Sequence, residues 1–355
     1  MTLSEKSHHR APAEKLTEVV ETIFTTAGQR PAHARTAADS LVHADLSGTH
    51  SHGSRLVAHY LPQLLAGAIN PRPEIRVARD DGATALIDGD AGMGHVTGTM
   101  GMERAIEKAR ALGVGVVGVG NSTHFGTAGR YAAMALAHDM VGFTTTNSPP
   151  ALPPAGGATP RVGNNPIAYA IPAGEEPPII LDMALSTVAR AKIIMAQQAG
   201  EKIPLGWALD ADGNPTDDPT VALGGMLAAI GGYKGFGLAV VMDVLCGILT
   251  GSDFGPHLGK QDDPTRHENA GHFFIAIDIS RFVPIDEFKA RTDQMIREIR
   301  ESRKGAGTER IYLPGEIEWR RRQERLTEGI PLPAGTISDI ERAAGMLNLS
   351  IDLFA

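Results

Sequence analysis

The sequence has few of the features that mark secreted, membrane-spanning or nucleic-acid-binding proteins. Its 355 residues include one cysteine, Cys246, which excludes an intramolecular disulfide and is typical of a reducing cytosol. The longest apolar run, residues 236–249, is too short to span a bilayer and contains Asp243. Residues 4–10 lack the apolar core of a signal peptide. We therefore expect a soluble, cytoplasmic protein.

Charge of one sign is not concentrated anywhere in the chain. The formal net charge is -8, and the 33 lysines and arginines are scattered, which argues against nucleic acid or an anionic membrane as a partner. Hydrophobic residues make up 42% of a chain long enough for two or three domains. The 41 glycines and 23 prolines indicate many tight turns, and therefore an enzyme-like fold that contains β-strands.

Three segments near the start of the chain have the apolar spacing of amphipathic helices. They are residues 12–28, 31–48 and 56–67, and each ends in a glycine. Pro62 should bend or split the third helix. The motif Thr49-His50-Ser51-His52-Gly53-Ser54-Arg55 precedes that helix, at an N-terminus whose free N–H groups favour an anionic ligand.

The motif at residues 49–55 is a candidate catalytic site. Histidine titrates near neutral pH and is the usual proton-transfer group. A neighbouring serine can orient the imidazole, and an arginine can hold a carboxylate through two parallel hydrogen bonds. On these residues alone, a polar helix junction with surface histidines is the simpler interpretation. The choice between this junction and a catalytic site therefore depends on motifs elsewhere in the chain.

From residue 73 onward the pattern changes to alternating strands and helices. Strands are predicted at 74–78, 83–87, 114–119, 141–146, 167–171, 179–183 and 272–279, the last with the alternation of a half-buried strand. Helices are predicted from about 94 to 112 and at 127–139, 187–198, 234–249 and 286–303, with a final helical pair. The polar segment 252–270 is predicted to be a long loop.

Two segments match part of a known binding motif but lack the features that the motif requires. Residues 113–118 match G-x-G-x-x-G, but the predicted helix precedes these glycines and they lie inside a strand pattern, so we expect no Rossmann fold. Residues 210–214 begin like a calcium-binding loop. Pro215 and Val221 then stand where that loop needs glycine and glutamate, so the segment is predicted to be a turn.

A metal site is not expected either. His43, His50 and His52 have no cysteine or acidic ligand at a supporting spacing. A metal-dependent hydrolase is nevertheless our alternative function from a different class of enzyme. A protein that only binds a ligand is disfavoured, because the histidines stand in polar, glycine-lined settings.

Small and polar residues gather at the ends of four predicted elements. These patches are Asn121-Ser122-Thr123-His124-Phe125-Gly126, Thr146-Asn147-Ser148, Asp182-Met183-Ala184 and Lys234-Gly235-Phe236-Gly237. In each of them, main-chain N–H groups and small side chains allow a ligand to approach closely. One such patch is usually a structural turn, but four of them together favour a large, extended cofactor.

In their order and spacing, these motifs resemble the malate/L-lactate dehydrogenase family of the non-Rossmann type. That family also holds sulfolactate, ureidoglycolate and diketogulonate dehydrogenases and cyclic imine reductases. The resemblance extends nearly end to end and rests on Ser51-His52-Gly53 with Tyr60 and on residues 86–90, 121–126, 163–166, 181–184, 233–238, 313–316 and 329–332.

The resemblance implies an α/β (α+β) fold whose mixed, largely antiparallel central sheet is flanked by helices. It implies an NAD(P)-binding sheet domain at residues 73–316 and a helical substrate and dimer domain built from residues 1–72 with 317–355. The implied protein is a homodimer that uses NAD or NADP to interconvert a small 2-hydroxy acid and its 2-oxo acid. A cyclic imine or keto-sugar-acid reductase is the alternative within the family.

Matched position by position, the resemblance implies that His52 is the proton donor, held by Ser51 and Asp182. His124 matches a second family histidine, to which some members assign the acid/base role, and His124 and Tyr60 are also implied substrate contacts. The positions that match cofactor contacts are Ser148, Asp182, Met183, Ala184, Lys234, Gly235, Pro314, Gly315 and Glu316.

The arginine that would hold the substrate carboxylate is displaced in this sequence. Many relatives carry an arginine four residues after the motif histidine, but here Leu56 stands at that position and Arg55 lies one residue earlier. Arg55 is thus the implied carboxylate ligand, although it lies about 100° further round a helix. Further candidates for anion binding are Arg130, Arg190 and Lys192.

Overall fold

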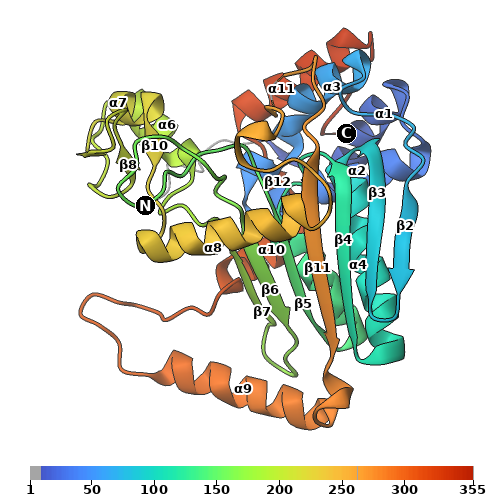
Figure 1. The fold of residues 1–355 in the computed structure, drawn as a ribbon, viewed down its shortest axis with the longest axis vertical. Coiled ribbons are helices and arrows are strands. Elements are labelled where there is room, and N and C mark those ends of the chain that lie inside the picture. Colours follow the sequence, from blue (N-terminus) through green and yellow to red (C-terminus); the bar gives the residue numbers. More distant parts are fainter. Residues whose placement is uncertain (1–8, 262, 355) are drawn as a thin grey trace.

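A seven-stranded sheet forms the centre of the molecule (Figure 1). The structure is a computed structural model that describes residues 9–261 and 263–354. The segment 4–10, which was predicted not to be a signal peptide, lies mostly outside the described residues. The strand order is β2–β3–β4–β11–β5–β6–β7, and only β3 and β4 are parallel neighbours. The strands are β2 (Arg76–Asp81), β3 (Thr84–Gly92), β4 (Val114–Ser122), β5 (Met140–Thr146), β6 (Ile167–Ile171), β7 (Ile179–Met183) and β11 (Ala270–Asp278). The predictions of a mixed, largely antiparallel sheet and of a non-Rossmann fold are confirmed.

Helices cover the two faces of this sheet unequally. Helices α4 (Gly94–Leu112) and α5 (Ala128–Met134) pack on one face, and α8 (Tyr233–Asp243) packs on the other. Along β11, Phe274 contributes to the core with α4 and α5, and Phe273 to the core with α8, because successive side chains of a strand point to opposite faces. The prediction that this strand is half-buried is wrong, since β11 lies between β4 and β5 with both faces covered.

The two ends of the chain share one apolar core. Helices α1 (Ala13–Thr26), α2 (Pro31–Ser47) and α3 (Val57–Ala66) lie beside α10 (Glu316–Glu328) and α11 (Ala334–Met346) (Figure 1). The buried side chains of this core include Leu16, Leu41, Leu61, Ile330 and Ile340. A short strand at each end, β1 (Arg10–Ala11) and β12 (Ile330–Pro331), forms an antiparallel pair. The proposed domain boundaries remain a prediction.

The helix α3 continues through Pro62, so the expected split does not occur. Proline removes one backbone hydrogen bond from the helix interior. The apolar face of α3, with Val57, Leu61 and Leu64, is fully or almost fully buried, and this burial offsets the lost bond.

The remaining elements form a small lobe and a separate helix. The lobe contains the sheet β10–β8–β9 (Met226–Leu227, Ala208–Leu209 and Pro215–Thr216) with α6 (Arg190–Ala199) and α7 (Pro219–Gly224). The helix α9 (Ile285–Glu301) is attached through Asp293, which accepts the backbone N–H groups of residues 174–176. Over the part of the chain that the structure describes, no helix has the length and apolar character needed to cross a membrane.

Candidate functional site

The histidine motif folds as two short 3-10 turns, His50–His52 and Ser54–Leu56, ahead of α3. The buried carboxylate of Asp45 organises both turns. One of its oxygens lies 2.8 Å from Nδ1 of His50, and the other accepts the backbone N–H of Ser54 at 2.7 Å. A Cβ atom on Gly53, between the turns, would lie only 2.0 Å from this carboxylate, so the chain can pass this close only at a glycine.

Four residues predicted for the site meet here, although His124 is far from the other three in the chain. The ring centroids of His52 and His124 are 5.5 Å apart. The hydroxyl oxygen of Tyr60 lies 2.5 Å from Nδ1 of His124, and Oγ of Ser51 lies 3.0 Å from Nδ1 of His52. The sequence placed these side chains on separate elements, and the fold joins them in one cluster.

Burial controls the protonation of this cluster. It lowers the pKa of His52 below the ordinary value, and it lowers the pKa of His124 well below that value, with nearby histidines adding to the effect. Burial, followed by the charge of Glu268, raises the pKa of Tyr60 well above its ordinary value. The cluster therefore contains neutral rings and a protonated phenol near neutral pH.

Two further residues adjoin the cluster and were not predicted as site residues. His95 is buried in the first turn of α4, and its ring centroid lies 5.2 Å from that of Tyr60. The pKa of His95 is lowered to about 3, mainly by burial. Glu268 is buried, and its Oε2 accepts the backbone N–H of His124 at 2.6 Å. Burial raises the pKa of Glu268 to about 7. In the sequence, His95 stands at the start of the helix predicted at 94–112, and Glu268 stands in the predicted loop 252–270, which has no periodic pattern.

Asp182 lies at the end of edge strand β7, and its side chain remains exposed. Its Oδ2 accepts the backbone N–H of Gly129 at 2.8 Å, in the first turn of α5, which follows the loop that carries His124. Desolvation by the surrounding protein raises the pKa of Asp182 to about 6. No hydrogen bond or ion pair joins Asp182 to Ser51 or His52 among the described residues, so its implied support of His52 remains a prediction.

A chain of contacts connects the other strand-end patches. Oγ of Ser148 donates to Oδ1 of Asn164 at 3.0 Å, and the backbone carbonyl of Asn164 accepts the N–H of Leu185 at 2.7 Å. The carbonyl of Leu185 accepts the N–H of Ile230 at 2.9 Å. A Cβ atom on Gly235 would lie 2.1 Å from the carbonyl oxygen of Ile230. The patches around residues 148, 182–184 and 234–235 are therefore linked through Asn164, Leu185 and Ile230.

The turn at 313–316 is fastened to the same strand, β7. The N–H of Ile180 donates to the carbonyl of Pro314 at 3.0 Å. Gly315 has a φ of +82°, and a Cβ there would lie 2.6 Å from the carbonyl oxygen of Ile180. Glu316 is buried; burial would raise its pKa, but hydrogen bonds from the chain and from Arg310 outweigh this effect and hold the pKa below its ordinary value.

Two predicted residues have other surroundings. Arg55 forms an ion pair of 3.6 Å with Asp339 of α11, and its side chain is 53% exposed. This contact does not bring it to His52, so its implied role at the substrate carboxylate stays untested. Lys234 is exposed in the first turn of α8, and no ion pair involves it among the described residues.

The histidines once compared with zinc ligands do not converge. His50 has Asp45 at Nδ1 and Arg325 at Nε2, whereas His43 contacts Arg322. Within residues 9–261 and 263–354, no group of three His, Cys, Asp or Glu side chains is arranged to hold a metal ion.

Comparisons with known proteins show the family of the chain. A family model described as malate/L-lactate dehydrogenase matches residues 11–341. The chain is 38% identical over 358 residues to a malate dehydrogenase of Pyrococcus abyssi, with 98% of each protein covered. The solved structure of sulfolactate dehydrogenase from Methanocaldococcus jannaschii superposes with a TM-score of 0.91 at 38% identity, covering 96% of this chain and 98% of that one.

Two more distant relatives carry cofactor names. The chain is 33% identical over 320 residues to a ureidoglycolate dehydrogenase (NAD(+)) of Escherichia coli K12, covering 90% of this chain and 91% of that protein. It is 34% identical over 312 residues to a (2R)-3-sulfolactate dehydrogenase (NADP(+)) of Chromohalobacter salexigens, covering 88% and 91%. Because these matches span almost the whole of each chain and the folds agree, this chain belongs to the malate/L-lactate dehydrogenase family.

Proposed function

We propose that this chain is an NAD(P)-dependent oxidoreductase that interconverts a small 2-hydroxy acid and its 2-oxo acid. The observation that carries the proposal is the cluster of His52, Tyr60 and His124. Asp182 of the strand-end patches is hydrogen-bonded to Gly129, in the helix that follows the loop of His124. The relatives support it, since they are named as dehydrogenases of malate, sulfolactate or ureidoglycolate, and two of the names include NAD(+) or NADP(+).

The residues present suit a dinucleotide cofactor. Lys234 is an exposed cation in the first turn of α8, where free backbone N–H groups and the helix dipole also favour phosphate. Ser148 and Ala184 are small, partly exposed residues on the connected patches, so a ligand can approach their main chain closely. When bound, the cofactor supplies or accepts the hydride.

The two histidines would have different roles in proton handling. The pKa of His124 lies well below its ordinary value because of burial, so this ring stays neutral, and the phenol of Tyr60 donates to its Nδ1. His124 then carries its proton on Nε2, from which it can donate to a substrate oxygen. His52 has a smaller pKa shift, and its Nδ1 is held by Ser51. His52 is therefore the residue that gains and loses the proton.

The test is an absorbance assay of NADH and NADPH oxidation. The substrates are pyruvate, oxaloacetate, phenylpyruvate and a cyclic imine. We expect oxidation of at least one reduced cofactor with a 2-oxo acid. Turnover with the cyclic imine alone would assign the chain to the imine reductases. Hydrolytic activity that a chelator abolishes, with no nicotinamide oxidation, would overturn the proposal.

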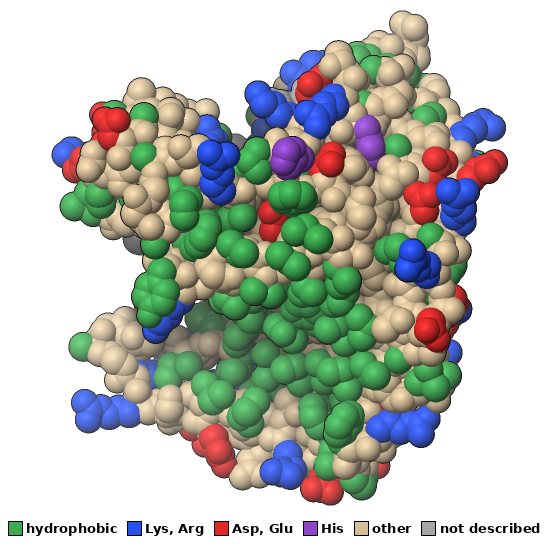
Figure 2. Space-filling model, viewed as in Figure 1, with side chains coloured by type: hydrophobic (Ala, Val, Ile, Leu, Met, Phe, Trp, Pro, Cys, Tyr) green, Lys and Arg blue, Asp and Glu red, His purple; other side chains and the backbone are tan. Residues whose placement is uncertain are grey.

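We also propose that the chain forms a homodimer through the outer face of α8. This apolar face continues onto the π-helical turn Val244–Ile248 that follows α8. It consists of the exposed side chains Tyr233, Leu238, Val240, Val241, Val244, Ile248 and Leu249. Figure 2 shows hydrophobic side chains gathered over α8 and over the sheet below it. A helix that is apolar on all sides is normally buried, and monomers rarely expose such large apolar patches. A second copy of this chain would cover the patch.

A further inference from the structure

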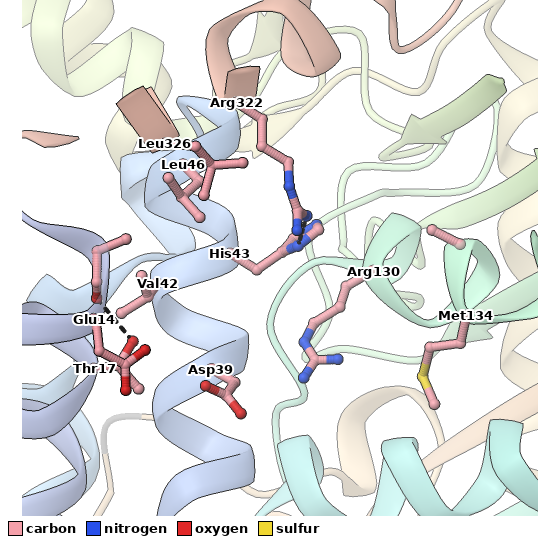
Figure 3. A pocket seen from close by; sticks show the side chains of 12 residues that line it. Glu14, Thr17, Asp39, Val42, His43, Leu46, Arg130, Met134, Arg322 and Leu326 are labelled. Atoms are coloured by element: carbon pink, nitrogen blue, oxygen red, sulfur yellow. Dashed lines mark hydrogen bonds between the residues drawn. The ribbon is translucent and has the colours of Figure 1, made fainter. Parts of the chain in front are cut away.

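A cavity of about 450 Å³ lies between α1, α2, α5 and α10 (Figure 3). Arg130 of α5 and Arg322 of α10 extend toward it from different elements. Neither the histidine cluster nor the strand-end patches contribute to its lining. The cavity is thus separate from the site described above.

Neither arginine is in direct contact with a carboxylate of the described residues, although the charge of Glu103 acts on Arg130 from beyond ion-pair distance. Among the described residues, neither Arg130 nor Arg322 forms an ion pair with a carboxylate. Nε of Arg130 is buried without a hydrogen-bond partner, and its guanidinium lies 5.9 Å from the ring centroid of Tyr131. Both side chains are half-buried, which removes part of the water that would otherwise stabilise their charge.

His43 lies on the same wall as the two arginines and supplies no negative charge. Arg322 contacts Nδ1 of His43. Burial, followed by the charges of Arg322 and Arg130, lowers the pKa of His43 to about 3, so this ring is neutral and can accept the hydrogen bond. The wall therefore carries two positive charges that repel each other. Burial, with Arg130 as the second cause, also lowers the pKa of Arg322.

The carboxylates on the opposite wall are already paired. Arg35 contacts Asp39 at 3.0 Å and Glu14 at 3.0 Å. These acids do not reach the two unpaired arginines, and they would repel negative charge at the far end of a long ligand. A ligand that fits both walls is compact and carries its negative charge at one end.

We propose that this cavity binds a small anion, a carboxylate or phosphate group, held by Arg130 and Arg322 together. Guanidinium groups bind both of these oxyanions through paired, charge-assisted hydrogen bonds. The bound anion would place a negative charge in direct contact with both arginines, which no carboxylate of the described residues does.

The test is calorimetric titration of the full-length protein at constant ionic strength. Separate arms use inorganic phosphate and succinate, which distinguish the two sources of the anion. We expect saturable binding in at least one arm. The variants Arg130→Gln and Arg322→Gln should each weaken it by about tenfold to a hundredfold, as expected for lost hydrogen bonds to a charged group.

Arg303→Gln is the matched control, because it removes one positive charge from an exposed arginine outside the cavity. It should bind like the unmodified protein. Arg130→Lys and Arg322→Lys keep the charge and replace the glutamine variants if those fail to fold; they should weaken binding less.

Three results would overturn the proposal. The first is no saturable binding in either arm, or binding that the arginine variants leave unchanged. The second is strict competition between the anion and the nicotinamide cofactor or the 2-oxo acid, which would assign the anion to the other site. The third is dissociation of an oligomer by Arg130→Gln or Arg322→Gln in sedimentation, which would assign the arginines to another copy of the chain.

Discussion

The hydroxyl oxygen of Tyr60 lies 2.5 Å from Nδ1 of His124, although the two residues are 64 positions apart. Tyr60 belongs to α3, in the core formed by both chain ends, and His124 follows β4 of the central sheet. The hydrogen bond therefore joins the helical part of the molecule to the sheet at the proposed site. The raised pKa of Tyr60, caused first by burial, keeps the phenol protonated, so Tyr60 can donate to Nδ1 of His124.

The variant Tyr60→Phe should lose turnover while retaining its fold. It leaves Nδ1 of His124 without a donor, and an unsatisfied buried group costs about 1–3 kcal/mol, or roughly tenfold to a hundredfold in kcat. Steady-state kinetics and cofactor fluorescence measure the effect. Tyr169→Phe on β6, where the ring is 41% exposed, is the control and should behave like the unmodified protein. Equal kcat in the two variants would contradict the assigned role of Tyr60.

His52→Gln should lower kcat by about 10²–10⁴, the usual contribution of a general acid or base. Cofactor affinity should change little, because the imidazole acts on the substrate oxygen. His124→Gln is the comparison: it should raise KM as well as lower kcat, because a donor to the substrate is lost. A larger kcat loss in His124→Gln than in His52→Gln would reverse the two assignments.

Asp182→Asn should alter two pH profiles. Desolvation by the surrounding protein raises the pKa of Asp182 to about 6, so the carboxyl is protonated in the folded protein between its ordinary value of 3.8 and 6. The stability that this proton contributes is lost as the pH rises through 6. The variant should therefore gain Tm relative to the unmodified protein at pH 8 more than at pH 5. Any inflection of kcat/KM near pH 6 should disappear.

The exposed Asp286, in the first turn of α9, offers a control for Asp182. Asp286→Asn should shift Tm by a similar amount at both pH values. A pH-independent difference between Asp182→Asn and the unmodified protein would show that Asp182 does not titrate near pH 6.

Gly315→Ala should destabilise the fold by about 1–3 kcal/mol, the usual cost of backbone strain at one residue. The φ of Gly315 is +82°, and the new Cβ would meet the carbonyl oxygen of Ile180 at 2.6 Å. Displacement of the 313–316 turn should also raise KM for the cofactor. Gly335→Ala in α11 meets nothing within 4 Å and should instead stabilise by up to about 1 kcal/mol. Chemical unfolding of both variants measures the contrast, and equal effects would contradict this account of residue 315.

Val241→Asp should dissociate the proposed homodimer, because it introduces a charge into the centre of the apolar face of α8. Val241 is 50% exposed, whereas Leu205 in the small lobe is 69% exposed and lies outside that face. Leu205→Asp should therefore leave the assembly unchanged. Sedimentation velocity measures both. A monomeric unmodified protein, or an intact dimer of Val241→Asp, would refute the dimer proposal.

Patterns that depend on neighbouring residues were predicted well. The strands at 167–171 and 179–183 have the expected bounds, since strand alternation is local. The glycines at 48 and 67 end their helices with φ of 84° and 83°, a conformation that glycine adopts without a Cβ penalty. Gly115 and Gly118 of the G-x-G-x-x-G match lie in β4 as predicted, because the order of helix and glycines is visible in the chain, whereas Gly113 ends α4.

Features that depend on distant partners were missed or misjudged. The alternation in β11 could not reveal that this strand lies between β4 and β5 and that both of its faces are covered. Pro62 was expected to bend or split a helix that continues through it, because burial of the apolar face preserves the helix. Glu268 had no local pattern, and its significance comes only from its 2.6 Å contact with His124.

The sequence by itself determined the family, the sheet-based fold class and the inventory of imidazole, hydroxyl and glycine groups, because these follow from residue identity, order and spacing. Only the tertiary structure decided which groups meet. It joined Tyr60 to His124, turned Arg55 toward Asp339 and left Arg130 and Arg322 unpaired beside a cavity. The physical reason is that such contacts form when apolar helix and sheet faces are buried against one another, and the spacing of residues along the chain does not encode which distant faces will pair.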